Sequence, residues 1–84
     1  MEKIKEIIWT QKFEQQFKKI KDRATQDKIE KQIKKILKTP SVGKPLKHDL
    51  KGERTIHVKP FRLIYTVQKD KLILLKFEHR DGVY

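Results

Sequence analysis

The sequence predicts a single α+β domain in which an antiparallel sheet is packed on one face by a helical hairpin. The chain has 84 residues, which is enough for one hydrophobic core but not for two. Apolar residues recur at helical spacing in the first half, and from residue 54 onward they alternate with a period of two. We therefore expect the order β-α-α-β-β-β, with residues 1–84 forming one domain.

A short strand and two helices are expected in the first half. Apolar, β-branched residues within residues 4–9 predict the strand, and Thr10 is a suitable N-cap for the helix that follows. Each helix is marked by one apolar stripe, Trp9, Phe13, Phe17 and Ile20 in the first and Ile29, Ile33, Ile36 and Leu37 in the second. Pro40 ends the second helix, because proline disfavours helical geometry in the preceding residue. The short connection favours an antiparallel hairpin.

A basic loop and three strands are expected in the second half. Glycine and proline punctuate residues 41–52, which is typical of a loop. Ile56 and Val58 alternate with polar residues, as in a half-buried strand that Pro60 ends. Residues 61–67 and 72–77 are rich in β-forming residues, and residues 68–71 connect them. The apolar run at residues 72–75 predicts a strand in the centre of the sheet.

Composition and charge narrow the classes of function. The 22 Lys and Arg outnumber the 11 Asp and Glu, so the chain carries a formal charge of +11. Such a charge favours a polyanionic partner, with nucleic acid as the first candidate, although Lys-rich surfaces also serve solubility or heat adaptation. The absence of Cys excludes disulfides and thiolate metal sites. No apolar stretch approaches the ~20 residues that span a bilayer, and no signal peptide is recognisable, so we expect a cytoplasmic protein without membrane contact.

Two groups of residues suggest chemistry. Arg62 lies among core-forming residues, so its guanidinium must be paired, either in a structural salt bridge or as a clamp for phosphate. The salt-bridge candidates are Asp49, Glu53 and Glu78. Near the C-terminus, His79, Arg80 and Tyr84 can supply a proton donor, a permanent cation and a ring on which a base stacks. The alternative for this tail is a frayed terminus.

The order of these motifs resembles the RelE/ParE toxin superfamily. The segment Phe61-Arg62-Leu63-Ile64-Tyr65 and the terminal His79-Arg80-Asp81-Gly82-Val83-Tyr84 follow two helices and a basic loop, and the resemblance covers essentially the whole chain. The chain looks like a RelE toxin, and its Lys- and Ile-rich usage resembles that of thermophilic archaea. The resemblance implies a type II toxin with a RelE-like fold that cleaves messenger RNA in the ribosomal A site, as a metal-independent endoribonuclease without cofactor.

The resemblance also implies roles for individual residues. Arg62 matches the strand arginine that binds the scissile phosphate, and Arg80 the arginine that favours departure of the 5′ oxygen. Tyr84 matches the tyrosine that stacks on the target base, and His79 occupies the position of a general acid. The reaction implied is attack by a 2′-hydroxyl on its own 3′-phosphate.

The general base and the RNA-binding residues are less directly matched. The paired lysines that act as base in RelE are absent in their usual register. The unperturbed pKa of a histidine would suit His57 to take the 2′-hydroxyl proton, or His57 is simply an exposed strand residue. Basic residues expected to hold the backbone of messenger or ribosomal RNA are Lys44, Lys47, Lys51, Arg54 and Lys59. For the lysines on the predicted helices, a solvent-exposed helix face is favoured over direct contact with RNA.

The resemblance implies a small acidic antitoxin of the RelB type as partner. Two other functions are compatible with the same fold. One is a ParE-like toxin that poisons DNA gyrase without nuclease activity, and the other is a non-catalytic RNA-binding protein. The combination of His79, Arg80 and Tyr84 favours the nuclease over both. No spacing of carboxylates or His predicts a metal site.

Overall fold

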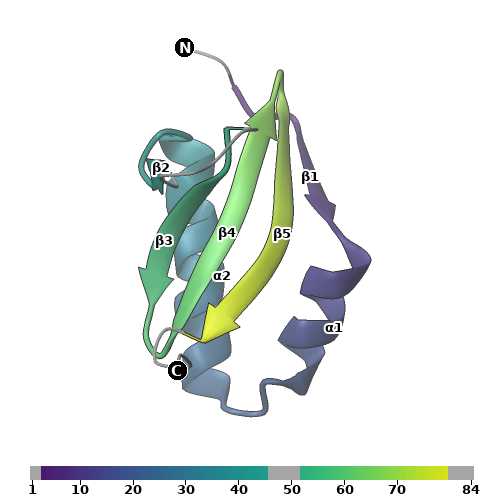
Figure 1. Cartoon of the computed structure of the whole chain (residues 1–84), viewed down its shortest axis with the longest axis vertical. Helices are drawn as coiled ribbons and strands as arrows, with labels where there is room; N and C mark the ends of the chain where they lie inside the picture. The colour runs from purple at the N-terminus through teal and green to yellow at the C-terminus, as the bar shows by residue number, and fades with distance from the viewer. Residues whose placement is uncertain (1–2, 46–51, 80–84) are drawn as a thin grey trace.

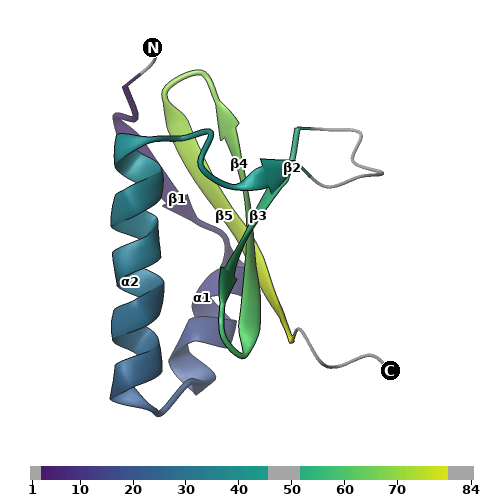
Figure 2. The same ribbon diagram turned by 90° about the vertical axis from the view of Figure 1, so that its left-hand side faces the viewer.

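The computed structural model describes residues 3–45 and 52–79. Along the chain the elements are β1 (Glu6–Trp9), α1 (Gln11–Lys19), α2 (Arg23–Lys38), β2 (Lys44–Pro45), β3 (Arg54–Val58), β4 (Phe61–Gln68) and β5 (Lys71–His79). A layer of two helices packs on one face of a single sheet (Figures 1 and 2). The predicted fold class and element order are confirmed, and β2 is an addition that the sequence did not predict. No helix in the described part of the chain is long and apolar enough to cross a membrane.

The sheet has the strand order β1-β5-β4-β3-β2 and is mixed rather than wholly antiparallel. Strands β3 to β5 pair antiparallel, as predicted, and the additional strand β2 pairs antiparallel with β3, whereas β1 pairs parallel with β5. The chain direction explains this difference, because α2 returns the chain to the end of the sheet where β1 begins (Figure 1). Since β3, β4 and β5 then alternate in direction, β5 runs the same way as β1.

The middle of the sheet is β4 rather than the apolar strand β5. Residues 63–66 of β4 are all buried, whereas β5 alternates between buried and half-buried residues over the apolar run at 72–75. β5 lies one place away, between β4 and the edge strand β1. The prediction of a buried interior strand is therefore correct for β5, and the prediction of the central position is wrong.

The start of α1 is fixed to the sheet by Thr10. Its hydroxyl accepts a hydrogen bond from the Phe13 amide at 3.3 Å and donates to the Leu74 carbonyl at 2.7 Å. This N-cap satisfies one of the amides that a helix leaves unpaired at its start, as predicted. Trp9 ends β1 and is 38% exposed, and its ring packs edge-on against Phe13 and Phe17.

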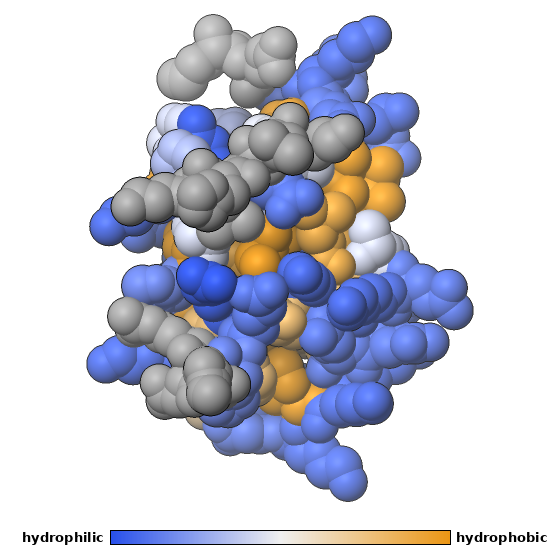
Figure 3. Space-filling view, viewed as in Figure 1, coloured by the Kyte–Doolittle hydropathy of each residue, from blue (hydrophilic) through white to orange (hydrophobic). Residues whose placement is uncertain are grey.

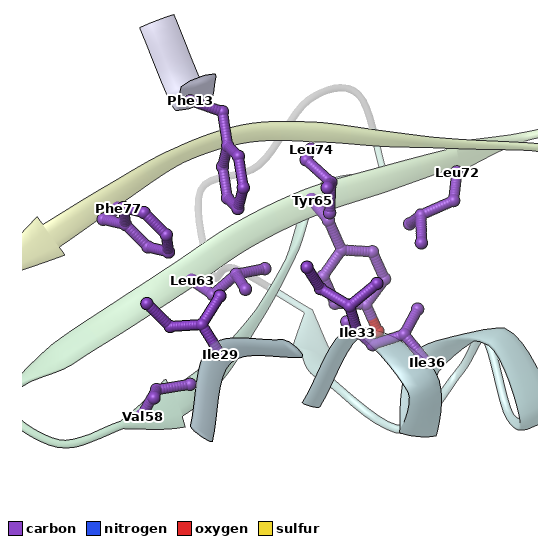
Figure 4. Packing of buried hydrophobic residues seen from close by; sticks show 10 residues of the cluster. All are labelled: Phe13, Ile29, Ile33, Ile36, Val58, Leu63, Tyr65, Leu72, Leu74 and Phe77. Carbon is purple, nitrogen blue, oxygen red and sulfur yellow. The ribbon is translucent and has the colours of Figure 1, made fainter. Parts of the chain in front are cut away.

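The hydrophobic core lies between the helices and one face of the sheet (Figure 4). Its helical members, Phe13, Ile29, Ile33 and Ile36, belong to the predicted stripes. From the strands come Val58, Leu63, Tyr65, Leu72, Leu74 and Phe77. Each such side chain contributes about 1.5–3 kcal/mol through burial, so this layer accounts for most of the stability. The other face of the sheet has no helix over it in the described part of the chain (Figure 2).

Candidate functional site

The face of the sheet opposite the helices, called here the open face, carries the candidate site. Leu63 and Tyr65 of β4 point into the core, and successive side chains of a strand face opposite ways, so the side chain of Arg62 lies on the open face. The cross-strand partners of Arg62 are His57 of β3 and Glu78 of β5. Directly paired residues share a face, so these three side chains form a row across the open face. Hydrophilic residues gather across the middle of this face, with apolar residues between them (Figure 3).

A second row lies beside the first. Thr55, Ile64 and Lys76 are cross-strand partners, and Lys44 of β2 pairs with Thr55 at the other end. Two cations, Lys44 and Lys76, are therefore directed to the same face as Arg62. Lys76 was not among the residues expected at the site, although a lysine two positions before Glu78 at the end of an apolar strand is a visible signal.

An irregularity in β5 decides which of its residues reach the open face. Tyr65 pairs with Leu74 and Ile64 pairs with Lys76, so Leu75 is an extra residue opposite the β4 ladder. Such a β-bulge reverses the alternation beyond it. Leu74 and Phe77 consequently both point into the core at a spacing of three residues, and Lys76 and Glu78 emerge beside Arg62.

The charged groups of the two rows contact one another. Arg62 Nη2 lies 2.7 Å from Glu78 Oε1, and Lys76 Nζ lies 3.3 Å from Glu78 Oε2. All three side chains are 37% exposed. The hydrogen bond from Arg62 and the nearby Lys76 hold the pKa of the Glu78 carboxyl below its usual value. Of the salt bridges that the sequence allowed for Arg62, the structure shows the one to Glu78.

The guanidinium of Arg62 is only partly satisfied by this pair. Its Nε is buried and has no hydrogen-bond acceptor among the residues that the structure describes. Thr55 Oγ1, in the neighbouring row on the same face, is likewise buried and lacks a partner within the described residues. Buried polar atoms are nearly always paired, so two such atoms on one face mark a place where a polar ligand would be stabilised.

The other described candidates are placed as follows. His57 is exposed and stands opposite Arg62 in β3, so the predicted base and the predicted phosphate clamp share one face. Lys44 is exposed, and Lys59 is exposed in the turn between β3 and β4. Arg54 donates to the Gly43 carbonyl at 2.7 Å, and its more distant contact with the Ser41 carbonyl is 3.4 Å long. Its guanidinium therefore secures the segment before β2, a structural use that the sequence did not predict.

His79 lies on the other side of the sheet. It pairs with Phe61, and the two rings meet edge-on with their centroids 5.4 Å apart. It lines a pocket of about 540 Å³ with Lys19, Asp22, Pro60, Phe61 and Phe77, between the helices and the end of the sheet. Consecutive strand residues face opposite ways, so Glu78 and His79 cannot both join the row of Arg62. The structure does not bring His79 together with Arg62 and His57.

Four further candidates, Arg80, Tyr84, Lys47 and Lys51, lie outside the described residues, as does Asp49. Within residues 3–45 and 52–79, no three His, Cys, Asp or Glu side chains gather where a metal ion could be held.

The sequence and fold place the chain in a known class of proteins. The family described as "ParE toxin of type II toxin-antitoxin system, parDE" matches residues 7–84, so the chain belongs to this family. It is thus a toxin of the RelE/ParE superfamily, as the resemblance implied. Among curated proteins, no sequence matches the chain.

Solved structures of similar fold come from both branches of the superfamily. The YoeB dimer of Staphylococcus aureus is 21% identical, with a TM-score of 0.78 over 88% of this chain and 94% of that one. The archaeal RelE-RelB complex of Pyrococcus horikoshii is 13% identical, with a TM-score of 0.75 over 99% of this chain and 100% of that one. The chromosomal ParDE system of Pseudomonas aeruginosa is 18% identical, with a TM-score of 0.70 over 90% and 96%. At such identities the likeness shows the fold alone.

Proposed function

We propose that this toxin is a metal-independent endoribonuclease that cuts messenger RNA in the ribosomal A site and holds the scissile phosphate on the open face of its sheet. The observation that carries the proposal is the position of Arg62. It lies near the start of the middle strand β4 and faces the open side of the sheet, opposite the exposed His57 and beside the cation Lys76. An arginine fork can bind a phosphate and stabilise its developing charge, and a nearby imidazole can accept the proton of the attacking hydroxyl.

The proposed reaction needs a base, a cation and a leaving-group donor. His57 takes the proton of the 2′-hydroxyl, and the 2′ oxygen bonds to phosphorus. Arg62 stabilises the negative charge that develops on the phosphorane oxygens. The bond to the 5′ oxygen breaks and that oxygen takes a proton from solvent water, which leaves a 2′,3′-cyclic phosphate and a 5′-hydroxyl, while His57 returns its proton to the solvent. By the resemblance, Arg80 assists this departure and Tyr84 stacks on the target base.

Two of the sequence-based assignments change in this proposal. His79 is left out, because its side chain lies on the helical side of the sheet against Phe61. Arg54 is left out of the RNA-binding set, because it is engaged with main-chain carbonyls. Lys44 and Lys59, both exposed, remain as contacts for RNA backbone, and Lys47 and Lys51 are retained by the resemblance.

The proposed partner in the resting cell is a small acidic antitoxin of the RelB type. The solved RelE structure of Pyrococcus horikoshii is a RelE-RelB complex, and the family is defined as half of a toxin-antitoxin pair. With a formal charge of +11, this chain favours a partner of opposite charge and fast electrostatic association.

A second candidate function is gyrase poisoning without RNA cleavage. The matching family carries the ParE name, and the ParDE system of Pseudomonas aeruginosa shares the fold. In that case the cations of the open face bind a protein or DNA surface, and a base such as His57 has no role.

Primer extension on translated messages, combined with a measurement of plasmid supercoiling after induction of the toxin, separates the two functions. The nuclease proposal predicts new 5′ ends within codons and unchanged supercoiling. Growth arrest with uncut messages and altered supercoiling would establish gyrase as the target instead.

A further inference from the structure

The salt bridges of the open face place an internal anion on the cations that are proposed to hold phosphate. The Glu78 carboxylate is bound through one oxygen to Arg62 and through the other to Lys76, at 2.7 Å and 3.3 Å. A phosphodiester also presents two anionic oxygens, and it binds guanidinium and ammonium groups in the same manner. Glu78 therefore fills the position that a phosphate between Arg62 and Lys76 would take.

The pair leaves part of the Arg62 guanidinium unused. Nε and Nη2 lie on the same edge of the guanidinium plane, and this edge can bind two oxygens of one anion side by side. Glu78 Oε1 accepts from Nη2, whereas Nε has no acceptor within the described residues. An anion with two oxygens directed to this edge would satisfy both donors, which the carboxylate in its bridging position does not.

The fold depends little on this ion pair. Both partners are 37% exposed, and ion pairs at such exposure contribute little to stability because water screens them. The backbone pairing of Arg62 with Glu78 belongs to the regular ladder between β4 and β5, and it holds the two residues in register without their side chains. The carboxylate is consequently free to be displaced at small cost.

We propose that Glu78 is a built-in competitor for the phosphate site, a carboxylate that weakens the binding of phosphodiester to Arg62 and Lys76 until a substrate held by further contacts displaces it. This inference rests on the proposed function, in which Arg62 binds the scissile phosphate. Glu78 is thus a specificity-determining residue rather than a catalytic one. Its carboxylate lowers the affinity of the site for isolated phosphates and for RNA that makes no further contacts. RNA that is bound at several other points is favoured.

The experiment follows phosphate at Arg62 directly. The Nε–Hε signal of Arg62 is observed by NMR in the full ¹⁵N-labelled chain, with Arg62→Lys used to assign it, and inorganic phosphate is titrated in. Glu78→Gln is expected to lower the dissociation constant at this signal about fivefold, and Glu78→Ala is expected to change it in the same direction. Glu30→Gln is the matched control, since Glu30 is exposed on α2 and its loss changes the net charge equally.

The outcomes are distinguishable from those of the nuclease test. If phosphate binds Arg62 equally well or more weakly in both Glu78 variants than in the wild type, Glu78 does not compete and the inference is overturned. If Glu30→Gln strengthens binding as much as Glu78→Gln, net charge explains the effect and the inference also fails. Because no cleavage is measured, a rise in phosphate affinity specific to Glu78 supports the competitor even where messages are found uncut.

Discussion

The Tyr65 hydroxyl accepts a hydrogen bond from the Gly43 amide at 2.9 Å and donates one to the Pro40 carbonyl at the same distance. Tyr65 is completely buried in the middle strand, whereas Gly43 and Pro40 belong to the segment that joins α2 to β2. One phenol therefore ties the chain after α2 to the centre of the core. The tie holds the segment just before β2, and β2 pairs with β3, the strand that carries His57.

Removal of this hydroxyl is expected to destabilise the protein. Tyr65→Phe keeps the ring in the core but leaves a buried amide and a carbonyl without their partner, which costs about 1–3 kcal/mol. Urea denaturation should show a lower midpoint with an unchanged m-value. A midpoint equal to that of the wild type would mean that water or a neighbouring group replaces the hydroxyl.

Gly43 is predicted to accept no side chain, because Tyr65 and the backbone of Thr55 both lie too close to it. A Cβ at position 43 would lie 2.7 Å from the Tyr65 hydroxyl oxygen and 2.9 Å from the Thr55 carbonyl oxygen, both closer than contact allows. Gly43→Ala should therefore lower the free energy of unfolding by about 1–3 kcal/mol. In a Tyr65→Phe background the hydroxyl clash is absent, so the penalty of Gly43→Ala should be smaller. Additive penalties in this double-mutant cycle would contradict the contact.

Ionisation of the Tyr65 hydroxyl should lower the stability of the protein at alkaline pH. Burial raises the pKa of the Tyr65 hydroxyl above its ordinary value of 10.0. Because the folded-state pKa lies above the unfolded one, this stabilisation is complete below pH 10.0 and is lost as the pH rises through the folded pKa. Thermal unfolding across this range should lose stability more steeply in the wild type than in Tyr65→Phe. Parallel profiles for the two proteins would show that Tyr65 does not titrate differently on folding.

The N-cap of α1 offers a test of how the helix is joined to the sheet. Thr10→Ala removes the acceptor for the Phe13 amide and the donor to the Leu74 carbonyl, and should cost about 1–2 kcal/mol. Thr10→Ser keeps the hydroxyl and serves as control, with most of the stability retained. Equal losses in both variants would assign the effect to the methyl group of threonine rather than to the cap.

Local patterns in the sequence were sufficient for the elements and for most of the core. The helical stripes identified Phe13, Ile29, Ile33 and Ile36, because a residue spacing of three or four places side chains on one helix face whatever the partner. The parallel pairing of β1 with β5 was not predictable in this way. It joins residues about 65 positions apart, as in the pairing of Glu6 with Lys71, and strand patterns alone carry no information about the partner.

The site was only partly predictable for a related reason. Arg62 was recognised because a charged residue within a core strand must have a special environment. The positions of Glu78 and His79 depend on the bulge at Leu75, and no residue in the run Leu72-Ile73-Leu74-Leu75 marks where such a bulge falls. Without the bulge, the side chain of His79 would lie on the open face with Arg62.

Whether the Arg62 guanidinium acts on an RNA phosphate is tested most directly by primer extension on translated messages from cells that express Arg62→Ala. Arg23→Ala is the matched control, since Arg23 is an exposed arginine at the start of α2 in the helical layer. We predict that the wild type and Arg23→Ala produce the same cleavage ends within codons, and that Arg62→Ala reduces them at least a hundredfold while remaining folded. Cleavage by Arg62→Ala at the level of the wild type would contradict the account.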